Sequence, residues 1–168
     1  MAANGDSVRR ELVALLPRLR RFARALTRNA VEADDLVQTA VERGLRNLDS
    51  WTPGTRLDAW MFRIMKNAWI DEARSSAVRA RVFAPEEAGA NVAADGAAGI
   101  EARLEAQAVY AAMRELPEEQ RLAVALVLIE GFSYREAADL LEVPIGTLTS
   151  RLARGRAAIE ARLAPKGA

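Results

Sequence analysis

The sequence predicts an all-α protein in which two small helical domains are joined by a flexible linker. Apolar residues recur at helical spacing through both ends of the chain, and no segment alternates as a strand would. Residues 84–99 differ from both ends, because they are rich in alanine, glycine and acids and contain no aromatic side chain. A chain of 168 residues is long enough for two small helical cores.

The first two helices are expected in residues 8–26 and 31–48, where apolar side chains follow the 3.6-residue period. Polar residues 27–29 end the first helix. Acidic residues gather in the first turn of the second helix, where the helix dipole favours negative charge.

A third helix is expected after a break at Pro53 and Gly54, and it completes a domain in residues 1–80. Its buried stripe is a set of apolar residues at helical spacing: Leu57, Trp60, Met61, Ile64, Met65 and Ala68. Trp69 lies beside this stripe, and the spacing leaves its burial open.

The expected linker covers residues 81–104. Its central part, residues 84–99, contains three glycines, one proline and three acids. Such a segment buries too little apolar area to offset the entropy lost on ordering. A surface loop within a single domain is the alternative.

The second domain is expected in residues 105–168. Residues 100–116 have a helical pattern that stops at Pro117, and this proline with the acids behind it opens the next helix. The apolar run of that helix ends at Gly131.

A helix-turn-helix is predicted next. Ser133 and Glu136 form a capping box at the start of a short helix, residues 142–146 form a turn, and residues 147–163 form a second helix rich in arginine. In such a unit the second helix enters the major groove of DNA. The last 26 residues carry five basic residues and one acid, which disfavours the alternative of an ordinary helical hairpin with a solvated basic face.

Composition excludes several classes of function. The chain has no cysteine and no histidine, which rules out disulfides, zinc fingers and histidine-based catalysis. The acids lie at helix starts and on solvated faces, so we expect no enzyme activity, metal site or cofactor. No apolar run approaches the ~20 residues of a membrane helix, and a signal-peptide pattern is lacking, so a cytoplasmic protein is expected.

Arginine dominates the basic residues, with 22 arginines and 2 lysines. The guanidinium group suits contacts to phosphates and base edges. A GC-rich genome would give the same bias, so this observation alone does not decide the function.

Two sets of segments resemble bacterial sigma factors of the extracytoplasmic-function (ECF) class, group 4 of the sigma-70 family. Similarity to region 4 is carried by residues 116–121 (LPEEQR), 131–138 (GFSYREAA) and 143–156 (VPIGTLTSRLARGR). Similarity to region 2 is carried by residues 33–38 (ADDLVQ) and 57–71 (LDAWMFRIMKNAWID). The segments occur in the family's order and span nearly all of the chain except the linker and the two tails.

The resemblance implies an alternative sigma factor that binds core RNA polymerase and directs promoter-specific initiation. Region 2 would read the melted minus-10 strand, region 4 would read the minus-35 duplex, and an anti-sigma factor would be a further partner. Two alternatives from other classes are a dimeric helix-turn-helix repressor or activator and a helical adaptor that binds only protein.

The resemblance also implies a site that docks on the polymerase clamp helices, with a further contact to the polymerase flap. The residues that match the clamp-binding surface are Asp34, Asp35 and Gln38. One helix face can present all three side chains. From the residues alone, paired acids at a helix start serve equally well as complements of the helix dipole.

For the minus-10 strand, the resemblance implies six residues of region 2: Trp51, Arg63, Lys66, Asn67, Asp71 and Arg74. An unstacked base needs a stacking or hydrogen-bonding host, which Trp51 and Asn67 can provide. The basic side chains can hold phosphates. For Trp51 the alternative is a lid on the small core.

For the minus-35 element, the matching positions are Arg135, Thr147, Thr149, Ser150, Arg151 and Arg154. Arg135 precedes the recognition helix and suits a phosphate better than a base. The sequence departs from the family pattern at Thr149, where a basic residue is frequent, and at Ala153, where a bulkier one is frequent. Base preference therefore does not transfer from relatives.

Overall fold

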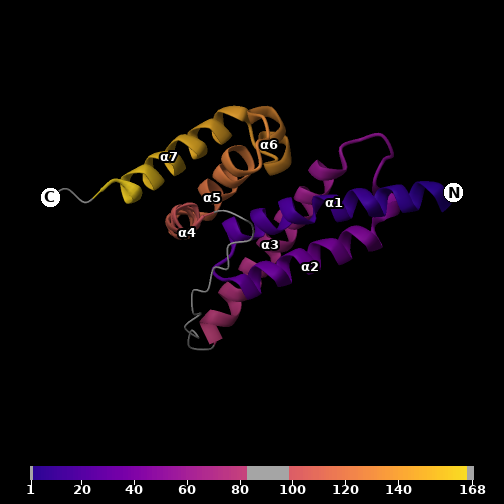
Figure 1. Ribbon diagram of the computed structural model, residues 1–168, viewed down its shortest axis with the longest axis horizontal. Helices are drawn as coiled ribbons and strands as arrows, with labels where there is room; N and C mark the ends of the chain where they lie inside the picture. Colours follow the sequence, from indigo (N-terminus) through magenta and orange to yellow (C-terminus); the bar gives the residue numbers. More distant parts are fainter. Residues whose placement is uncertain (1, 83–98, 166–168) are drawn as a thin grey trace.

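The structure is a computed structural model that describes residues 2–82 and 99–165, and these residues form helices without any strand. Figure 1 shows the first three helices as one group and the last four as another, with the two chain ends far apart. The expected all-α class is confirmed.

The N-terminal half is a bundle of α1 (Ala2–Leu26), α2 (Ala30–Arg46) and α3 (Leu57–Val82), in which each helix contacts the other two. A 3₁₀ turn, η1 (Leu48–Ser50), follows α2. The Asn29 side chain caps α2 by accepting a hydrogen bond from the Glu32 backbone N–H at 2.9 Å.

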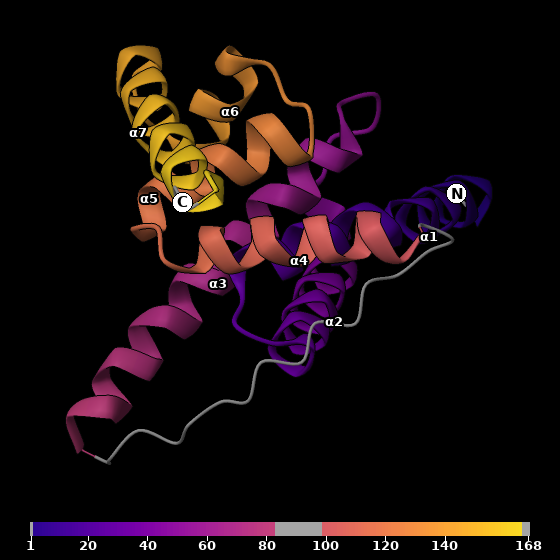
Figure 2. The same cartoon turned by 60° about the vertical axis from the view of Figure 1, so that its left-hand side comes forward.

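The C-terminal half consists of α4 (Ile100–Arg114), α5 (Glu118–Val124), α6 (Tyr134–Leu141) and α7 (Ile145–Leu163). Between α5 and α6 the chain forms a π-helical turn, η2 (Ala125–Ile129). In Figure 2, α4 crosses the N-terminal bundle, and it contacts α1 as well as α7.

Both ends of the predicted linker, residues 81–104, are helical, because α3 continues to Val82 and α4 begins at Ile100. Residues 83–98, which hold nearly all of its glycine-rich part, lie outside the described residues. The division into two domains stays a prediction.

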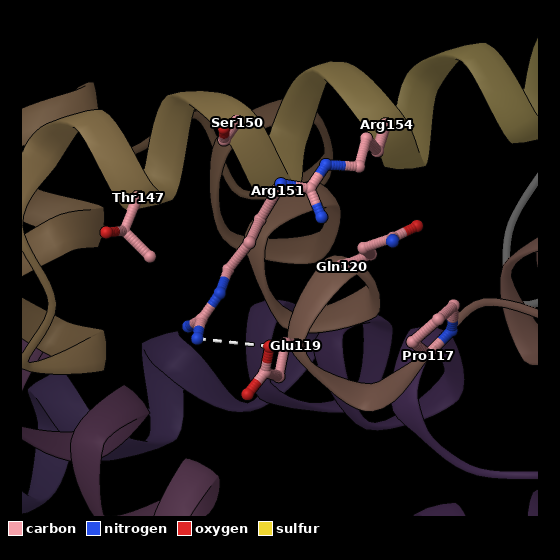
Figure 3. Close-up of a pocket in the computed structure, with 7 residues that line it drawn as sticks. All are labelled: Pro117, Glu119, Gln120, Thr147, Ser150, Arg151 and Arg154. Carbon is pink, nitrogen blue, oxygen red and sulfur yellow. Dashed lines mark ion pairs between the residues drawn. The ribbon is translucent and has the colours of Figure 1, made fainter.

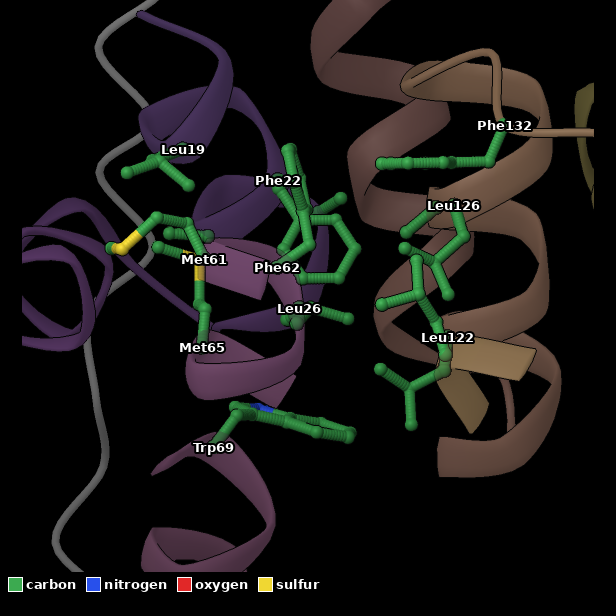
Figure 4. Close-up of a cluster of buried hydrophobic side chains, with 14 of the residues drawn as sticks. Leu19, Phe22, Leu26, Met61, Phe62, Met65, Trp69, Leu122, Leu126 and Phe132 are labelled. Carbon is green, nitrogen blue, oxygen red and sulfur yellow. The ribbon is translucent and has the colours of Figure 1, made fainter. Parts of the chain in front are cut away.

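Buried side chains of the two halves form one continuous hydrophobic cluster (Figure 4). Phe62 of α3 lies at its centre, with its ring centroid 4.9 Å from that of Phe22 and 5.2 Å from that of Phe132, both edge to face. Trp69, whose burial the sequence left open, is buried in this cluster, and Trp60 packs half-buried against it. The halves therefore share apolar surface.

Candidate nucleic-acid interface

The helix-turn-helix is fixed by local hydrogen bonds. The Ser133 hydroxyl accepts from the Glu136 backbone N–H at 3.2 Å, and the Glu136 carboxylate accepts from the Ser133 N–H at 2.8 Å, which is the predicted capping box. Glu142 ends α6 in the left-handed conformation, with φ 56°. Pro144 then caps α7, which therefore begins at Ile145, two residues before the predicted start.

The buried face of this unit holds α7 against α5 and α6. Leu148 and Leu152 of α7 are buried, as are Ala137 and Leu140 of α6. The rest of the α7 surface carries five of the six residues predicted to read the minus-35 element: Thr149, Ser150 and Arg154 are exposed, and Thr147 and Arg151 are half-buried.

Four of those residues line a pocket of about 290 Å³ between α7 and the start of α5: Thr147, Ser150, Arg151 and Arg154 (Figure 3). Ser150 and Arg154 are exposed, whereas the Arg151 guanidinium reaches Glu119 of α5 at 3.1 Å. Among the described residues, Arg154 has no ion pair or side-chain hydrogen bond.

The other two predicted minus-35 residues do not line this pocket. Thr149 is exposed on α7, and its hydroxyl donates to the Ile145 carbonyl at 2.8 Å. Arg135 is exposed on α6. The phosphate contact expected for Arg135 stays a prediction.

A larger groove of about 620 Å³ lies between α3 and the C-terminal half, and it contains four predicted minus-10 residues: Lys66, Asn67, Asp71 and Arg74. Asn67, Asp71 and Arg74 are exposed, and Asp71 pairs with Arg43 of α2 at 2.9 Å. Arg151 of the recognition helix lines the same groove. In this arrangement the two predicted DNA surfaces adjoin.

Lys66 differs from its neighbours because the C-terminal half covers it. Its side chain is 6% exposed, its Nζ donates to the Leu140 carbonyl at 3.0 Å, and the Glu142 carboxylate lies 3.7 Å away. Burial lowers the pKa of Lys66, and the charge of Arg63 lowers it further, while Glu142 partly opposes both.

Two of the predicted minus-10 residues lie outside the groove. Arg63 is exposed on α3. Trp51 follows η1 and packs half-buried against the core, and its buried indole Nε1 has no hydrogen-bond partner among the described residues. Trp51 thus has both the core contact and an unsatisfied donor.

The predicted polymerase-binding residues share one exposed surface on α2. Asp34, Asp35 and Gln38 are all exposed, and the Gln38 amide donates to Glu42 at 3.2 Å. Within the described part of the chain, neither aspartate has an ion pair.

Several groove residues could not be predicted from the sequence, because they come from both halves of the chain. Arg43 enters from α2, Ile70 from α3, Leu122 from α5 and Leu141 from α6. No periodicity within one helix links these positions. The only local signal was an arginine at position 43, five residues before the end of the expected helix.

No helix in the described residues is long and apolar enough to cross a membrane. The same residues contain no group of three or more acids that could hold a metal ion.

Family models match both halves of the chain. Residues 12–66 match the model described as the Sigma2 domain of PhyR, and residues 106–159 match that of Sigma-70, region 4. A helical bundle followed by a helix-turn-helix half, with these two matches, defines a protein of the sigma-70 class.

Two relatives identify the subgroup of sigma factors to which the chain belongs. The chain is 39% identical over 163 residues to the ECF RNA polymerase sigma factor EcfG of Rhodopseudomonas palustris, covering 97% of this chain and 88% of that one. It is 38% identical over 139 residues to the ECF sigma factor SigM of Mycobacterium tuberculosis, covering 83% and 68% respectively. The chain belongs to the ECF RNA polymerase sigma factors, and it is an alternative sigma factor that directs transcription.

A solved structure agrees with this assignment. The sigma factor RpoE of Bartonella quintana, determined in complex with the anti-sigma factor NepR, has a TM-score of 0.79 and 30% identity to this chain. The match covers 95% of this chain and 98% of that protein. The alternative of a conventional dimeric helix-turn-helix regulator is not favoured.

Proposed function

We propose that this sigma factor brings core RNA polymerase to its promoters through two separate DNA contacts, one on α7 and one on α3. The observation that carries the proposal is the exposed polar face of α7, held by a capped helix-turn-helix. The protein acts in the cytoplasm, where the polymerase works, and positions partners without catalysing a reaction.

On the minus-35 duplex, α7 reads base edges in the major groove. Ser150 and Arg154 are exposed on one face, and Arg154 is not engaged by any described acid. A free guanidinium can donate two parallel hydrogen bonds to a guanine. Thr147, Thr149 and Arg151 flank this contact, and Arg135 binds a phosphate.

On the minus-10 strand, α3 and the loop before it capture an unpaired base. Asn67 presents an exposed amide in the groove, and Trp51 presents an indole whose N–H is unsatisfied. Arg63, Lys66 and Arg74 neutralise phosphates of the same strand, and Asp71 orients Arg43 beside them.

On the polymerase, Asp34, Asp35 and Gln38 bind the clamp helices. The two carboxylates are exposed and close in sequence, so they offer a concentrated negative charge to a basic partner. Region 4 contacts the flap. An anti-sigma factor is a further partner, since the Bartonella relative was solved with one and aligns over nearly its whole length.

Run-off transcription with two variants tests this division of roles. Arg154→Ala removes a contact to the minus-35 duplex and should cost about 1–3 kcal/mol in promoter binding if that contact is to a base. Asn67→Ala should leave duplex binding intact and impair capture of the unpaired strand.

A template with a premelted minus-10 bubble separates the two defects. The bubble supplies the unstacking energy in advance, so it should restore Asn67→Ala more than Arg154→Ala on templates that share one minus-35 sequence. Equal restoration of both variants, or of neither, would contradict the assigned roles. Glu160→Gln, which changes an exposed residue near the end of α7, is the matched control and should behave as wild type on both templates.

A further inference from the structure

Three glutamates of the C-terminal half each meet a basic residue of the N-terminal half. Glu130 pairs with Arg18 and Arg21, Glu136 with Arg56, and Glu142 with Lys66. They follow one another at intervals of six residues from the end of η2 to the end of α6. The contact between the halves is therefore electrostatic as well as apolar.

Glu130 is the most buried of the three and accepts the most hydrogen bonds from the N-terminal half. Its side chain is 0% exposed, and its carboxylate accepts hydrogen bonds from Arg21 at 2.9 and 3.0 Å and from Arg18 at 3.2 Å. A buried carboxylate is stable only while such donors neutralise it. Separating the halves removes every one of these donors, because all belong to α1.

Two aromatic rings lie close to the Arg18 guanidinium that binds Glu130. The Arg18 guanidinium lies 5.2 Å from the ring centroid of Phe62 and 5.7 Å from that of Phe132, so one cation joins an acid and two rings across the interface. Phe132 is two residues beyond Glu130. The Glu130 pair and the Phe62–Phe132 contact thus form and break together.

The closed arrangement occupies groups that the proposed DNA contacts need. Lys66 is bound to the Leu140 carbonyl and lies beside Glu142, so a DNA phosphate cannot reach it. Asn67 and Arg74 share their groove with Arg151, which belongs to the recognition helix. A strand bound by α3 and a duplex bound by α7 would therefore meet at Arg151, which lines both pockets.

We propose that Glu130 is an autoinhibitory latch: its ion pairs with Arg18 and Arg21 hold the C-terminal half over Lys66, and promoter binding requires them to break. The glutamates of the C-terminal half form ion pairs with cations of the N-terminal half, as the phosphates of DNA would. The inhibitory consequence rests on the proposed function, whereas the latch itself does not.

Distance measurements on the isolated chain test the latch. The chain has no cysteine, so spin labels on Arg20→Cys and Ala157→Cys, two exposed positions in α1 and α7, are the only ones present. Wild type should give one population of label distances. Glu130→Gln should add a second population and raise the ratio of open to closed molecules by about tenfold or more, because charge-assisted bonds to a buried carboxylate are lost.

Arg21→Gln approaches the same contact from the other half. It removes two of the three hydrogen bonds and leaves Arg18 in place, so it should open the chain less than Glu130→Gln does. If circular dichroism shows that Glu130→Gln is unfolded, Arg21→Gln takes its place as the test of the latch. Glu72→Gln, which removes an exposed ion pair within α3, is the matched control and should keep the wild-type distances. Wild-type distances in folded Glu130→Gln, or in Arg21→Gln where the former does not fold, overturn the latch.

Transcription with limiting sigma factor tests the inhibition. Opening raises the competent fraction, so apparent promoter affinity should rise in proportion for Glu130→Gln and not for Glu72→Gln. If Glu130→Gln opens the chain but its apparent promoter affinity does not exceed that of an active wild type, the latch has no inhibitory role. Absence of promoter-directed transcription from every variant, wild type included, would instead contradict the proposed function, while the label distances would still decide the latch.

Discussion

Asp58, at the start of α3, accepts hydrogen bonds from four donor groups. Its carboxylate accepts from Arg18 at 3.0 Å, from Arg56 at 2.7 and 3.0 Å, and from the Ala59 backbone N–H at 2.8 Å. Burial alone would raise the pKa of this acid, but the bonds from Arg56, Arg18 and Ala59 lower it from 3.8 to about 2. The ionised form is thus favoured by the fold.

This shift predicts a specific acid sensitivity. Because the folded pKa lies below the unfolded one, the stabilisation is fully present above about pH 4 and is lost as the pH falls toward 2. At neutral pH it amounts to about 2 kcal/mol. Asp58→Asn should lower the free energy of unfolding by about this amount at pH 6, and the difference from wild type should shrink toward pH 2.

Urea unfolding of wild type and Asp58→Asn between pH 2 and 6 measures the difference. Asp49→Asn is the control, since Asp49 is exposed and has no hydrogen bond or ion pair from its side chain among the residues described. A pH-independent difference between wild type and Asp58→Asn would show that packing, rather than charge, holds this position.

At the scale of single elements, the sequence predicted those features that depend on neighbours along the chain. The Ser133–Glu136 capping box is an example, since both partners lie within one helical turn. The π-helical turn at 125–129 escaped prediction, because its apolar residues suit an α-helix equally well. The helices α2 and α7 begin one and two residues earlier than predicted, because Asn29 and Pro144 are their N-caps.

The candidate site was less predictable than the helices. Positions on one helix, such as Ser150 and Arg154, could be assigned to a common face. The role of Glu130 could not be found, because its partners precede it by 109 and 112 residues. One signal was available: a single acid between an apolar run and Gly131 is a candidate for a buried ion pair.

Close packing of α7 on α5 predicts a contrast between two glycines of α7. A Cβ on Gly155 would lie 2.7 Å from a Val124 methyl and 3.4 Å from the Gln120 carbonyl oxygen. Val124 is β-branched and cannot easily turn aside. Gly155→Ala should cost about 1–3 kcal/mol from overpacking, partly offset by about 1 kcal/mol of helix propensity.

Gly146→Ala is the matched control. Its Cβ would meet no heavy atom within 4 Å, so only the propensity gain of up to about 1 kcal/mol remains. Urea unfolding of both variants should therefore show shifts of opposite sign in the midpoint. A stabilised Gly155→Ala would mean that α5 and α7 can separate without cost.

For the whole molecule, the predicted linker gives an expectation about proteolysis. The composition of residues 84–99 favours cleavage there, and each half contributes buried side chains to the core, such as Met65 from the first and Met113 from the second. A glutamate-specific protease should cut first after Glu86 or Glu87 and leave two resistant fragments. The double variant Glu86→Gln, Glu87→Gln should slow this first cut, and a single resistant core spanning residues 60–130 would contradict two domains.

Because α3 and α4 are covalently connected, the two halves need only a low affinity for each other to stay in contact. A short tether keeps its two ends at an effective concentration on the order of millimolar. Contacts too weak to join separate molecules in a cell can then keep one chain closed. A competitor that resembles one half, and binds the other half with the same affinity, must be present above that effective concentration to open the chain. A partner that binds both halves at once instead benefits from the tether, because the tether keeps its two binding surfaces close together.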